Sequence, residues 1–156
     1  MSFEEIYNTY WQKVFRLSMG YLNDHDSAKD IAQETFINVW EQLPKFRKES
    51  SIGTWIFRIA SNNCLHQIEK NNKMPKSNLP FDIEDNLQPS IEGETEFLYK
   101  CISELPEIER IIISLELEDI NQSEIAKIVG VSKGSVRVKI HRIKEKLTQK
   151  FKKNEY

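Results

Sequence analysis

The sequence QSEIAKIVGVSKGSVR, at residues 122–137, has the pattern of two short helices joined by a tight turn. Ala126 is small, which suits a position where two helices cross closely. Gly130 stands where the turn needs a positive backbone φ, a conformation that glycine adopts without steric cost. Ser132 is expected to cap the second helix with its hydroxyl. Together these features predict a helix-turn-helix unit.

The second helix of this unit is predicted to be basic outside its apolar stripe of Val136, Ile140, Ile143 and Leu147. Cations near the start of such a helix can reach base edges in the major groove, and those farther along can contact phosphates. Residues 122–156 hold 10 Lys and Arg against 3 Asp and Glu, the excess expected of a phosphate-binding surface. A generic hairpin with a solvated basic face is the alternative, but the coincidence of turn glycine, apolar spacing and charge favours DNA binding.

The net charge of the whole chain, −2, conceals this asymmetry, because residues 74–96 hold 6 acids and only 1 base. No apolar run approaches the roughly 20 residues that a membrane helix requires. The acidic N-terminus lacks an apolar signal segment. Cys64 and Cys101 stand alone without metal-ligand spacing, which suits a reducing compartment. A cytoplasmic protein is therefore expected.

Apolar residues recur at spacings of three and four through residues 1–72, which predicts three amphipathic helices. Asp26 or Ser27 is expected to cap the second helix. Ser50 or Ser51 is expected to cap the third. The inner stripe of the second helix is expected to comprise Ala28, Ile31, Ala32, Thr35, Phe36, Val39, Trp40 and Leu43.

Residues 73–95 break this pattern with prolines, Asn, Ser and an excess of acids, which is typical of a flexible linker. Helical periodicity returns at Phe97, and Pro106 is well placed to open a further helix. The inner face of that helix is expected to comprise Ile108, Ile111, Ile112 and Leu115. The sequence therefore predicts an all-α fold of two small helical domains, residues 1–72 and 96–153, joined by an acidic linker.

The segment between the second and third helices mixes cations with aromatic residues around a serine-rich loop. Cations beside aromatic and amide groups suit an unstacked base, because they offer stacking as well as hydrogen bonds to its edges. The alternative is that Phe46, Trp55 and Phe57 are core residues, and for Trp55 and Phe57 we favour core packing or a mixed role. The outer face of the third helix is expected to carry Arg58, Ser61, Asn62, His66 and Lys70.

In their order and spacing, several short motifs resemble the extracytoplasmic-function (ECF) sigma factors, the smallest group of the sigma-70 family of bacterial transcription initiation factors. The motifs are DIAQETF at 30–36, VW at 39–40, FR at 46–47, TWIFRIA at 54–60, LPE at 105–107, EIA at 124–126, GSVR at 134–137 and HR at 141–142. Each motif alone is weakly specific, whereas their joint order is highly specific and covers nearly the whole chain.

The resemblance implies that residues 1–72 are sigma region 2 and residues 96–153 are sigma region 4. The implied partners are core RNA polymerase, through its β′ clamp helices and β flap, promoter DNA and an anti-sigma factor. The clamp helices would meet Asp30, Gln33, Glu34 and Asn38, a polar face that in isolation is usually just solvated. The −10 promoter element would be read and melted by Phe46, Arg47, Lys48, Ser50, Ser51, Arg58, Ser61, Asn62 and His66. The −35 element would be read by Lys133, Ser135, Arg137, Val138, Lys139, His141, Arg142 and Lys144.

Three positions depart from the family pattern. Leu115 stands where the family often has a basic residue that holds the −35 backbone, which puts that phosphate contact in doubt. Asp119 stands where glycine is common, and Ser135 stands where threonine is common. Ser135 keeps the hydroxyl, so this last change is mild.

The sequence contains no Gly-rich phosphate loop, no group of metal ligands and no nucleophile with a histidine partner. Catalysis, a metal, a cofactor and a small-molecule substrate are therefore not expected. A free-standing repressor or activator with the same helix-turn-helix is one alternative, but it leaves residues 1–72 unexplained. A protein-interaction module without a DNA role is another, and the basic C-terminal segment argues against it. The favoured hypothesis is an alternative sigma factor that directs promoter-specific initiation and is controlled by an anti-sigma factor.

Overall fold

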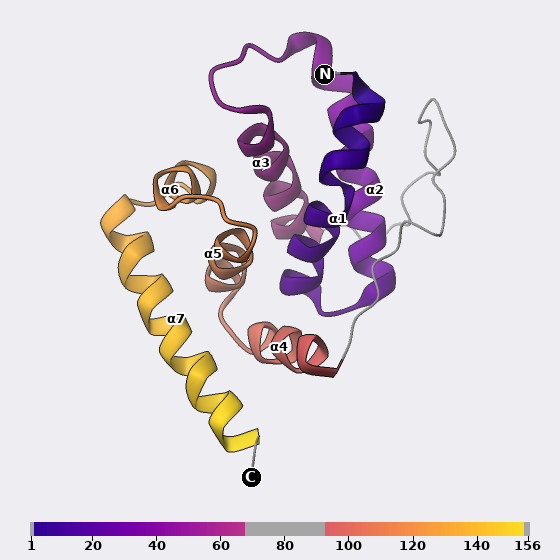
Figure 1. The fold of residues 1–156 in the computed structure, drawn as a ribbon. Coiled ribbons are helices and arrows are strands. Elements are labelled where there is room, and N and C mark those ends of the chain that lie inside the picture. Colours follow the sequence, from indigo (N-terminus) through magenta and orange to yellow (C-terminus); the bar gives the residue numbers. More distant parts are fainter. Residues whose placement is uncertain (1, 68–92, 155–156) are drawn as a thin grey trace.

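Helices account for the regular secondary structure of the described residues, 2–67 and 93–154, in this computed structural model (Figure 1). In chain order they are α1 (Phe3–Leu22), α2 (His25–Gln42), the short 3-10 helix η1 (Leu43–Lys45), α3 (Ile52–Leu65), α4 (Gly93–Ser103), α5 (Glu107–Leu117), α6 (Gln122–Val129) and α7 (Lys133–Asn154). The all-α prediction is confirmed. The predicted linker lies outside the described residues except at its end, where α4 begins. Over the described ranges, no helix combines the length and the apolar character needed to cross a membrane.

The N-terminal unit, α1–α3, packs around a cluster of large aromatic side chains. Tyr7 and Trp11 of α1 stack with 5.3 Å between their ring centroids, and Phe36 of α2 meets Tyr7 edge-on at 5.1 Å. All three rings are buried, and so is Phe57 of α3. Aromatic pairs of this geometry stabilise a core beyond the area that they bury, so the cluster holds α1 against α2. The core role expected for Phe57 is confirmed.

Side-chain caps set the first residues of α2 and α3. The Asp24 carboxylate caps α2, because its Oδ2 accepts a hydrogen bond from the Ser27 N–H at 2.9 Å. The prediction that Asp26 or Ser27 would be the cap is wrong, since the helix begins directly after Asp24. At α3, the Ser51 hydroxyl accepts from the Thr54 N–H at 3.2 Å, which confirms a serine cap.

Trp40 lies at the margin of the α2 stripe and is 43% exposed, so its predicted inward position is wrong. One side of its ring packs edge-on against Phe3, with 5.1 Å between the centroids. Trp40 follows the buried Val39 by one residue, and the helical step of about 100° turns its side chain toward solvent.

In the C-terminal unit, α6 and α7 form the predicted helix-turn-helix. Gly130 has a φ of 77°, in the left-handed region, and its N–H donates to the Ala126 carbonyl at 2.8 Å. The Ser132 hydroxyl accepts from the Ser135 N–H at 3.1 Å. The turn glycine and the serine cap are therefore both confirmed. The apolar stripe expected on α7 is buried, namely Val136, Ile140, Ile143 and Leu147.

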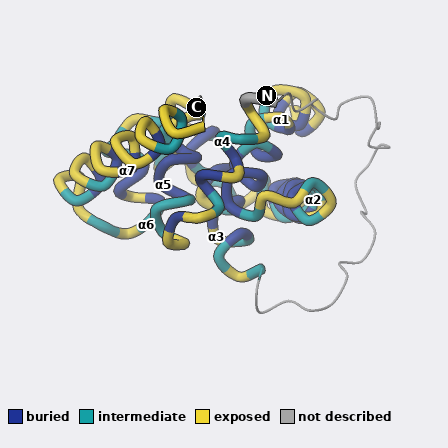
Figure 2. The backbone as a smooth tube through the Cα atoms, turned by 90° about the horizontal axis from the view of Figure 1, so that it is seen from below, coloured by how far each residue is buried: buried dark blue, intermediate teal, exposed yellow. Residues whose placement is uncertain are grey.

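The middle of α5 is buried on every side. Residues 111–115 are all buried, and the four steps of about 100° between them pass round the whole helix. Figures 1 and 2 show why, since α5 lies between α7 on one side and the N-terminal unit on the other. The hydrophobic core consequently runs through both units. The sequence predicted one inner face for α5, and the structure adds a second, which includes Ile113 and Ser114.

Replacing Gly130 with alanine is expected to lower the free energy of unfolding by about 1–2 kcal/mol, because a Cβ disfavours the left-handed conformation. No atom lies within 4 Å of the added Cβ, so the cost is conformational and not steric. Gly134→Ala is the matched control, since its Cβ also meets open space but its position is helical. The control is expected to be neutral or stabilising in urea unfolding followed by circular dichroism. Equal effects of the two substitutions would contradict this explanation.

Candidate nucleic-acid interface

The first half of α7 presents the predicted −35 residues in two rows. Lys133, Arg137 and His141 are exposed and lie four residues apart, so they follow one another along one side of the helix. Val138 and Arg142, also exposed and four apart, form a second row beside them. Ser135 and Lys139 are half-buried at the margins. This side of α7 is uncovered and basic, as a helix that enters the major groove must be.

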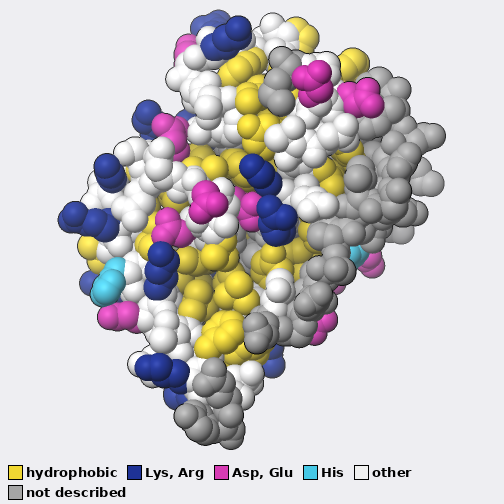
Figure 3. Space-filling view, in the orientation of Figure 1, with side chains coloured by type: hydrophobic (Ala, Val, Ile, Leu, Met, Phe, Trp, Pro, Cys, Tyr) yellow, Lys and Arg dark blue, Asp and Glu magenta, His cyan; other side chains and the backbone are white. Residues whose placement is uncertain are grey.

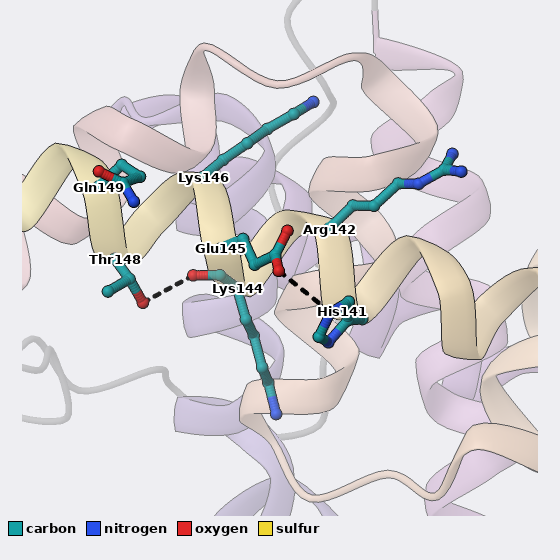
Figure 4. A pocket seen from close by; sticks show the side chains of 7 residues that line it. All are labelled: His141, Arg142, Lys144, Glu145, Lys146, Thr148 and Gln149. Carbon is teal, nitrogen blue, oxygen red and sulfur yellow. Dashed lines mark hydrogen bonds and ion pairs between the residues drawn. The ribbon is translucent and has the colours of Figure 1, made fainter.

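Lys144 differs from this group, because its Nζ lies 2.8 Å from Glu116 Oε2 on α5. Arg142 and Lys144 extend from α7 in different directions (Figure 4). The hollow drawn there is lined only by α7 residues, so it is the space between splayed side chains of one helix. Within it, His141 Nε2 lies 3.1 Å from Glu145 Oε1. Lys144 is thus held by an acid of its own unit, while Arg142 is left to the solvent face.

Carboxylates accompany the farther cations of α7 as well. Lys146 Nζ lies 3.6 Å from Glu109 Oε1, and Lys150 Nζ lies 2.8 Å from Glu104 Oε1. The hydrogen bond from Lys150 lowers the pKa of the Glu104 carboxyl. Figure 3 shows acidic side chains interleaved with basic ones near the edge formed by α7. The basic character of this surface is therefore concentrated toward the start of α7.

The loop between η1 and α3 encloses a surface pocket of about 460 Å³. Its walls are Ile6, Leu43, Phe46, Lys48, Ser50 and Ile52. The Phe46 ring packs on Trp55 at 4.8 Å between centroids, which holds the loop against α3. Lys48, which lines the pocket, has a φ of 59°, in the left-handed region that few residues other than glycine adopt. Apolar side chains together with a cation and a hydroxyl in the lining suit a flat heteroaromatic group such as a base.

Of the residues expected on the outer face of α3, Arg58, Asn62 and His66 are exposed. Ser61 is only 1% exposed, so its predicted outward position is wrong. It lies on one side of the helix with the buried Phe57 and Cys64, at spacings of four and three residues. Lys70 lies outside the described residues. The loop residues Arg47, Lys48 and Ser51 are exposed, and Ser50 and Phe46 are half-buried.

The predicted polymerase-docking face of α2 is only partly open. Asp30 is exposed and Gln33 is half-buried. Glu34 is 4% exposed, because it lies one turn after Ile31 at the edge of the buried stripe. Asn38 is tied to α3, since its Oδ1 accepts from Asn63 Nδ2 at 3.0 Å. The structure brings these four residues to one helix but does not expose them equally.

Two of the three departures from the family pattern, at Leu115 and Asp119, have a structural explanation. Leu115 is fully buried, so its side chain belongs to the core and offers nothing to a phosphate. Asp119 has a φ of 62°, in the left-handed region that glycine adopts without steric cost. Aspartate is among the few other residues that visit this region readily. The turn after α5 is therefore preserved without the glycine.

Sequence analysis missed the contact between α1 and α5. Arg16 Nε and Nη2 donate to Glu118 Oε2 and Oε1 at 2.8 and 2.7 Å, a two-pronged ion pair. Arg110 Nη1 donates to the Tyr21 carbonyl at 2.8 Å. The signal that predicts such a contact is the apolar run of three isoleucines at 111–113, since three consecutive helical residues point in directions about 100° apart and cannot share one inner face.

Comparison with known families and proteins identifies both units. Sigma-70 region 2 matches residues 6–74, and Sigma-70, region 4 matches residues 97–147. The ECF RNA polymerase sigma-E factor of Escherichia coli K12 is 31% identical over 158 residues, which cover 90% of this chain and 82% of the relative. The ECF RNA polymerase sigma factor SigW of Bacillus subtilis is 28% identical, with coverage of 97% and 89%.

Two solved structures share the fold across nearly the whole chain. The sigma factor RpoE of Bartonella quintana, in complex with the anti-sigma factor NepR, has a TM-score of 0.77 at 21% identity, covering 96% of each chain. CnrH, in complex with the cytosolic domain of CnrY, has a TM-score of 0.72 at 19% identity, covering 96% of this chain and 87% of its own. Taken with the family matches and the 31% identical relative, these findings show that the chain belongs to the ECF group of the sigma-70 family.

Proposed function

We propose that this protein is an alternative sigma factor of the bacterial cytoplasm, which binds core RNA polymerase and directs it to specific promoters. The observation that carries this function is the pairing, in one chain, of an uncovered basic recognition helix with a separate loop pocket. A repressor needs the first but has no use for the second. The chain contributes binding and base capture, and the chemistry of transcription stays with polymerase.

Region 4 anchors the complex on the −35 element. The rows on α7 enter the major groove, where Arg137 and Arg142 reach base edges and Lys133 contacts the backbone. Lys139 and the Ser135 hydroxyl add contacts at the margins, and Lys144 joins only if it leaves Glu116.

Region 2 opens the −10 element. One unstacked base enters the pocket, whose lining includes the apolar Ile52 and Phe46 and the polar Lys48 and Ser50. Arg58 and Asn62, exposed on α3, then track the displaced strand. Capture of the base offsets the cost of unstacking it, so melting follows from binding alone. Ser61 takes no direct part, because it is buried.

Polymerase holds both DNA-binding surfaces near the promoter, which neither surface achieves alone. The β′ clamp helices of polymerase bind Asp30 and Gln33, and its β flap binds region 4. This tethering gives each DNA-binding surface a high effective concentration at its promoter element. An anti-sigma factor regulates the protein, a role supported by the similar fold of the sigma factor RpoE, which was solved in complex with the anti-sigma factor NepR.

The decisive experiment is run-off transcription with core polymerase on a panel of candidate promoters. Promoter-specific transcripts that depend on this chain, with no other sigma factor present, are the expected result. Tight, specific binding to duplex DNA without polymerase, and no transcripts on any promoter, would replace this proposal with a free-standing regulator. Binding to another sigma factor without DNA binding would identify an adaptor instead.

Substituting both Asp30 and Gln33 with alanine is expected to weaken core polymerase binding by about tenfold, because an exposed charge and an amide at a docking surface are lost together. The affinity is measured by fluorescence anisotropy of labelled protein titrated with core polymerase. Asp26→Ala, an exposed acid on the first turn of the same helix, is the control and should bind normally. An unchanged affinity of the double variant would show that polymerase binds a different face of the protein.

A further inference from the structure

Val138 is an exposed apolar side chain in the middle of the predicted −35 surface. It is 43% exposed, and within α7, whose residues 133–154 are all described, it is the only exposed hydrophobic side chain. The other aliphatic side chains of α7 are buried. Valine is also a weaker helix former than the lysines and arginines that cover much of this helix, so helix stability does not explain its presence.

Position 138 lies on the side of α7 farthest from the core. Val138 comes two residues after the buried Val136 and two before the buried Ile140, and each helical step turns a side chain by about 100°. Its side chain therefore projects nearly opposite to both. A recognition helix enters the major groove with the side that faces away from its own core. Val138 is consequently placed to approach base edges more closely than the half-buried Ser135 and Lys139 at the margins.

The positions that surround Val138 on the helix surface provide no apolar neighbour. At spacings of three and four residues they are Gly134, Ser135, His141 and Arg142. A docking site for a protein partner is usually a contiguous apolar patch, which is absent from these positions. An isolated aliphatic side chain beside cations matches duplex DNA instead. Phosphates border the major groove, and the apolar group on its base edges is the C5-methyl of thymine.

The shape of valine suits such a contact. Branching at Cβ leaves one strongly preferred χ1 rotamer in a helix, so the two γ-methyl groups of Val138 keep a fixed direction before DNA is bound. A contact made by a preorganised side chain loses little conformational entropy. It involves no hydrogen bond, so it distinguishes thymine from uracil by apolar burial alone.

We propose that Val138 reads the C5-methyl group of a thymine in the −35 element and thereby selects a T·A pair at one position. This inference deepens the proposed function and rests on it, because it requires α7 to enter the −35 major groove. Arg142 follows Val138 by one turn, about 6 Å along the helix axis, whereas base pairs are stacked about 3.4 Å apart. The thymine read by Val138 therefore lies within about two base pairs of the position that Arg142 reads.

A methyl scan of the −35 element is the principal test. On a promoter that the protein transcribes with core polymerase, each −35 thymine of either strand is replaced in turn by uracil, which removes the methyl group and keeps the hydrogen-bonding edge. Thymine and uracil templates compete for limiting polymerase complex in one reaction and give run-off transcripts of different length. Uracil at one position is expected to lower its transcript about fourfold, the effect of one buried methyl group. That position should lie within two base pairs of the one at which Arg142→Ala changes base preference.

Val138→Ser is the matching change in the protein. It removes both γ-methyl groups at similar helix propensity, so α7 should stay folded, as circular dichroism will show. The ratio of thymine to uracil transcripts at the sensitive position should fall to near one. Val138→Ile keeps a branched aliphatic side chain and should retain the preference for thymine. Leu117→Ser, which removes a 46% exposed apolar side chain at the end of α5, is the control and should leave the ratio unaltered.

Adding a methyl group provides the reverse test. Replacing the sensitive T·A pair with C·G should lower transcription, and 5-methylcytosine at the same place should restore part of it, because only the methyl group differs between these two templates. The restoration should occur with the wild type and not with Val138→Ser. Equal transcription from the cytosine and 5-methylcytosine templates with the wild type would contradict methyl reading.

The outcomes separate the methyl contact from the function. Transcripts from the unmodified promoter without any uracil-sensitive −35 position would overturn methyl reading and leave the sigma-factor function intact. Undiminished sensitivity in Val138→Ser would assign the contact to another residue. Weaker core polymerase binding by Val138→Ser at a wild-type transcript ratio would make Val138 a protein contact. Absence of transcripts from every unmodified promoter would overturn the proposed function, and the methyl contact with it.

Discussion

Truncating Phe36 to alanine is expected to lower the free energy of unfolding by about 3–5 kcal/mol, the cost of deleting a fully buried aromatic ring. Phe36 contacts Tyr7 edge-on at 5.1 Å and lies 6.0 Å from Trp11, so its loss leaves a void in the cluster that joins α1 to α2. The surrounding rings cannot close this void without leaving their own packing positions. Because domains are stable by only about 5–15 kcal/mol, much of the fold's stability is at stake.

Urea unfolding followed by tryptophan fluorescence measures this loss, since Trp11 lies in the cluster. Trp40→Ala is the matched control on the same helix, because its larger ring is 43% exposed. A cost near 1 kcal/mol is expected there, as nearly half of the Trp40 surface is already exposed to water. If both substitutions destabilised the protein equally, the division between buried and marginal positions on α2 would be wrong.

Replacing Arg137 with alanine is expected to cost about 1–3 kcal/mol in discrimination at one position of the −35 element, which is a loss of roughly 5- to 150-fold. Arg137 is exposed in the middle of the row that begins at Lys133, where a side chain in the major groove reaches base edges. A guanidinium donates to two acceptors of guanine at once, whereas alanine contacts neither. Transcription is expected to fall most on promoters with the preferred base and least on those already lacking it.

The measurement is run-off transcription on promoters that differ at single −35 positions. Lys152→Ala, which removes an exposed cation from the far end of α7, is the control for the loss of charge alone. It should leave the order of promoter preference intact. If Arg137→Ala lowered transcription uniformly across all promoters, Arg137 would be a phosphate contact and another residue would read the base.

Local features could be predicted from the sequence because a few neighbouring residues determine them. The left-handed turn at Gly130 and the cap at Ser132 depend on the backbone preferences of those residues alone. The apolar stripe of α7 follows from helical periodicity in the same way. Arg137 and Arg142 lie outside this stripe, so their exposure could be predicted as well. These predictions needed no knowledge of how the two units meet.

The features that could not be predicted from the sequence lie on helix surfaces that a second element covers. Arg16 and Glu118 are 102 residues apart, and each has the character of an ordinary surface residue until α1 and α5 meet. Ser61 is polar and was placed outward for that reason, although it continues a buried stripe. Glu34 was misjudged similarly, at the edge of the α2 stripe. In each case the side chain is polar, but its burial is decided by its position on a helix that packs against more than one neighbour.

The acids that accompany the lysines of α7 have a thermodynamic consequence. Affinity for DNA depends on how many condensed counterions a protein displaces, with each phosphate neutralised contributing about 0.9 to the slope of log K against log salt. A lysine already neutralised by a neighbouring carboxylate displaces fewer ions. Such lysines are Lys144, Lys146 and Lys150, paired with Glu116, Glu109 and Glu104. The salt sensitivity of region 4 is therefore expected to fall below what its count of cations suggests. Promoter recognition would then depend less on ionic strength and more on the few arginines that are predicted to contact bases.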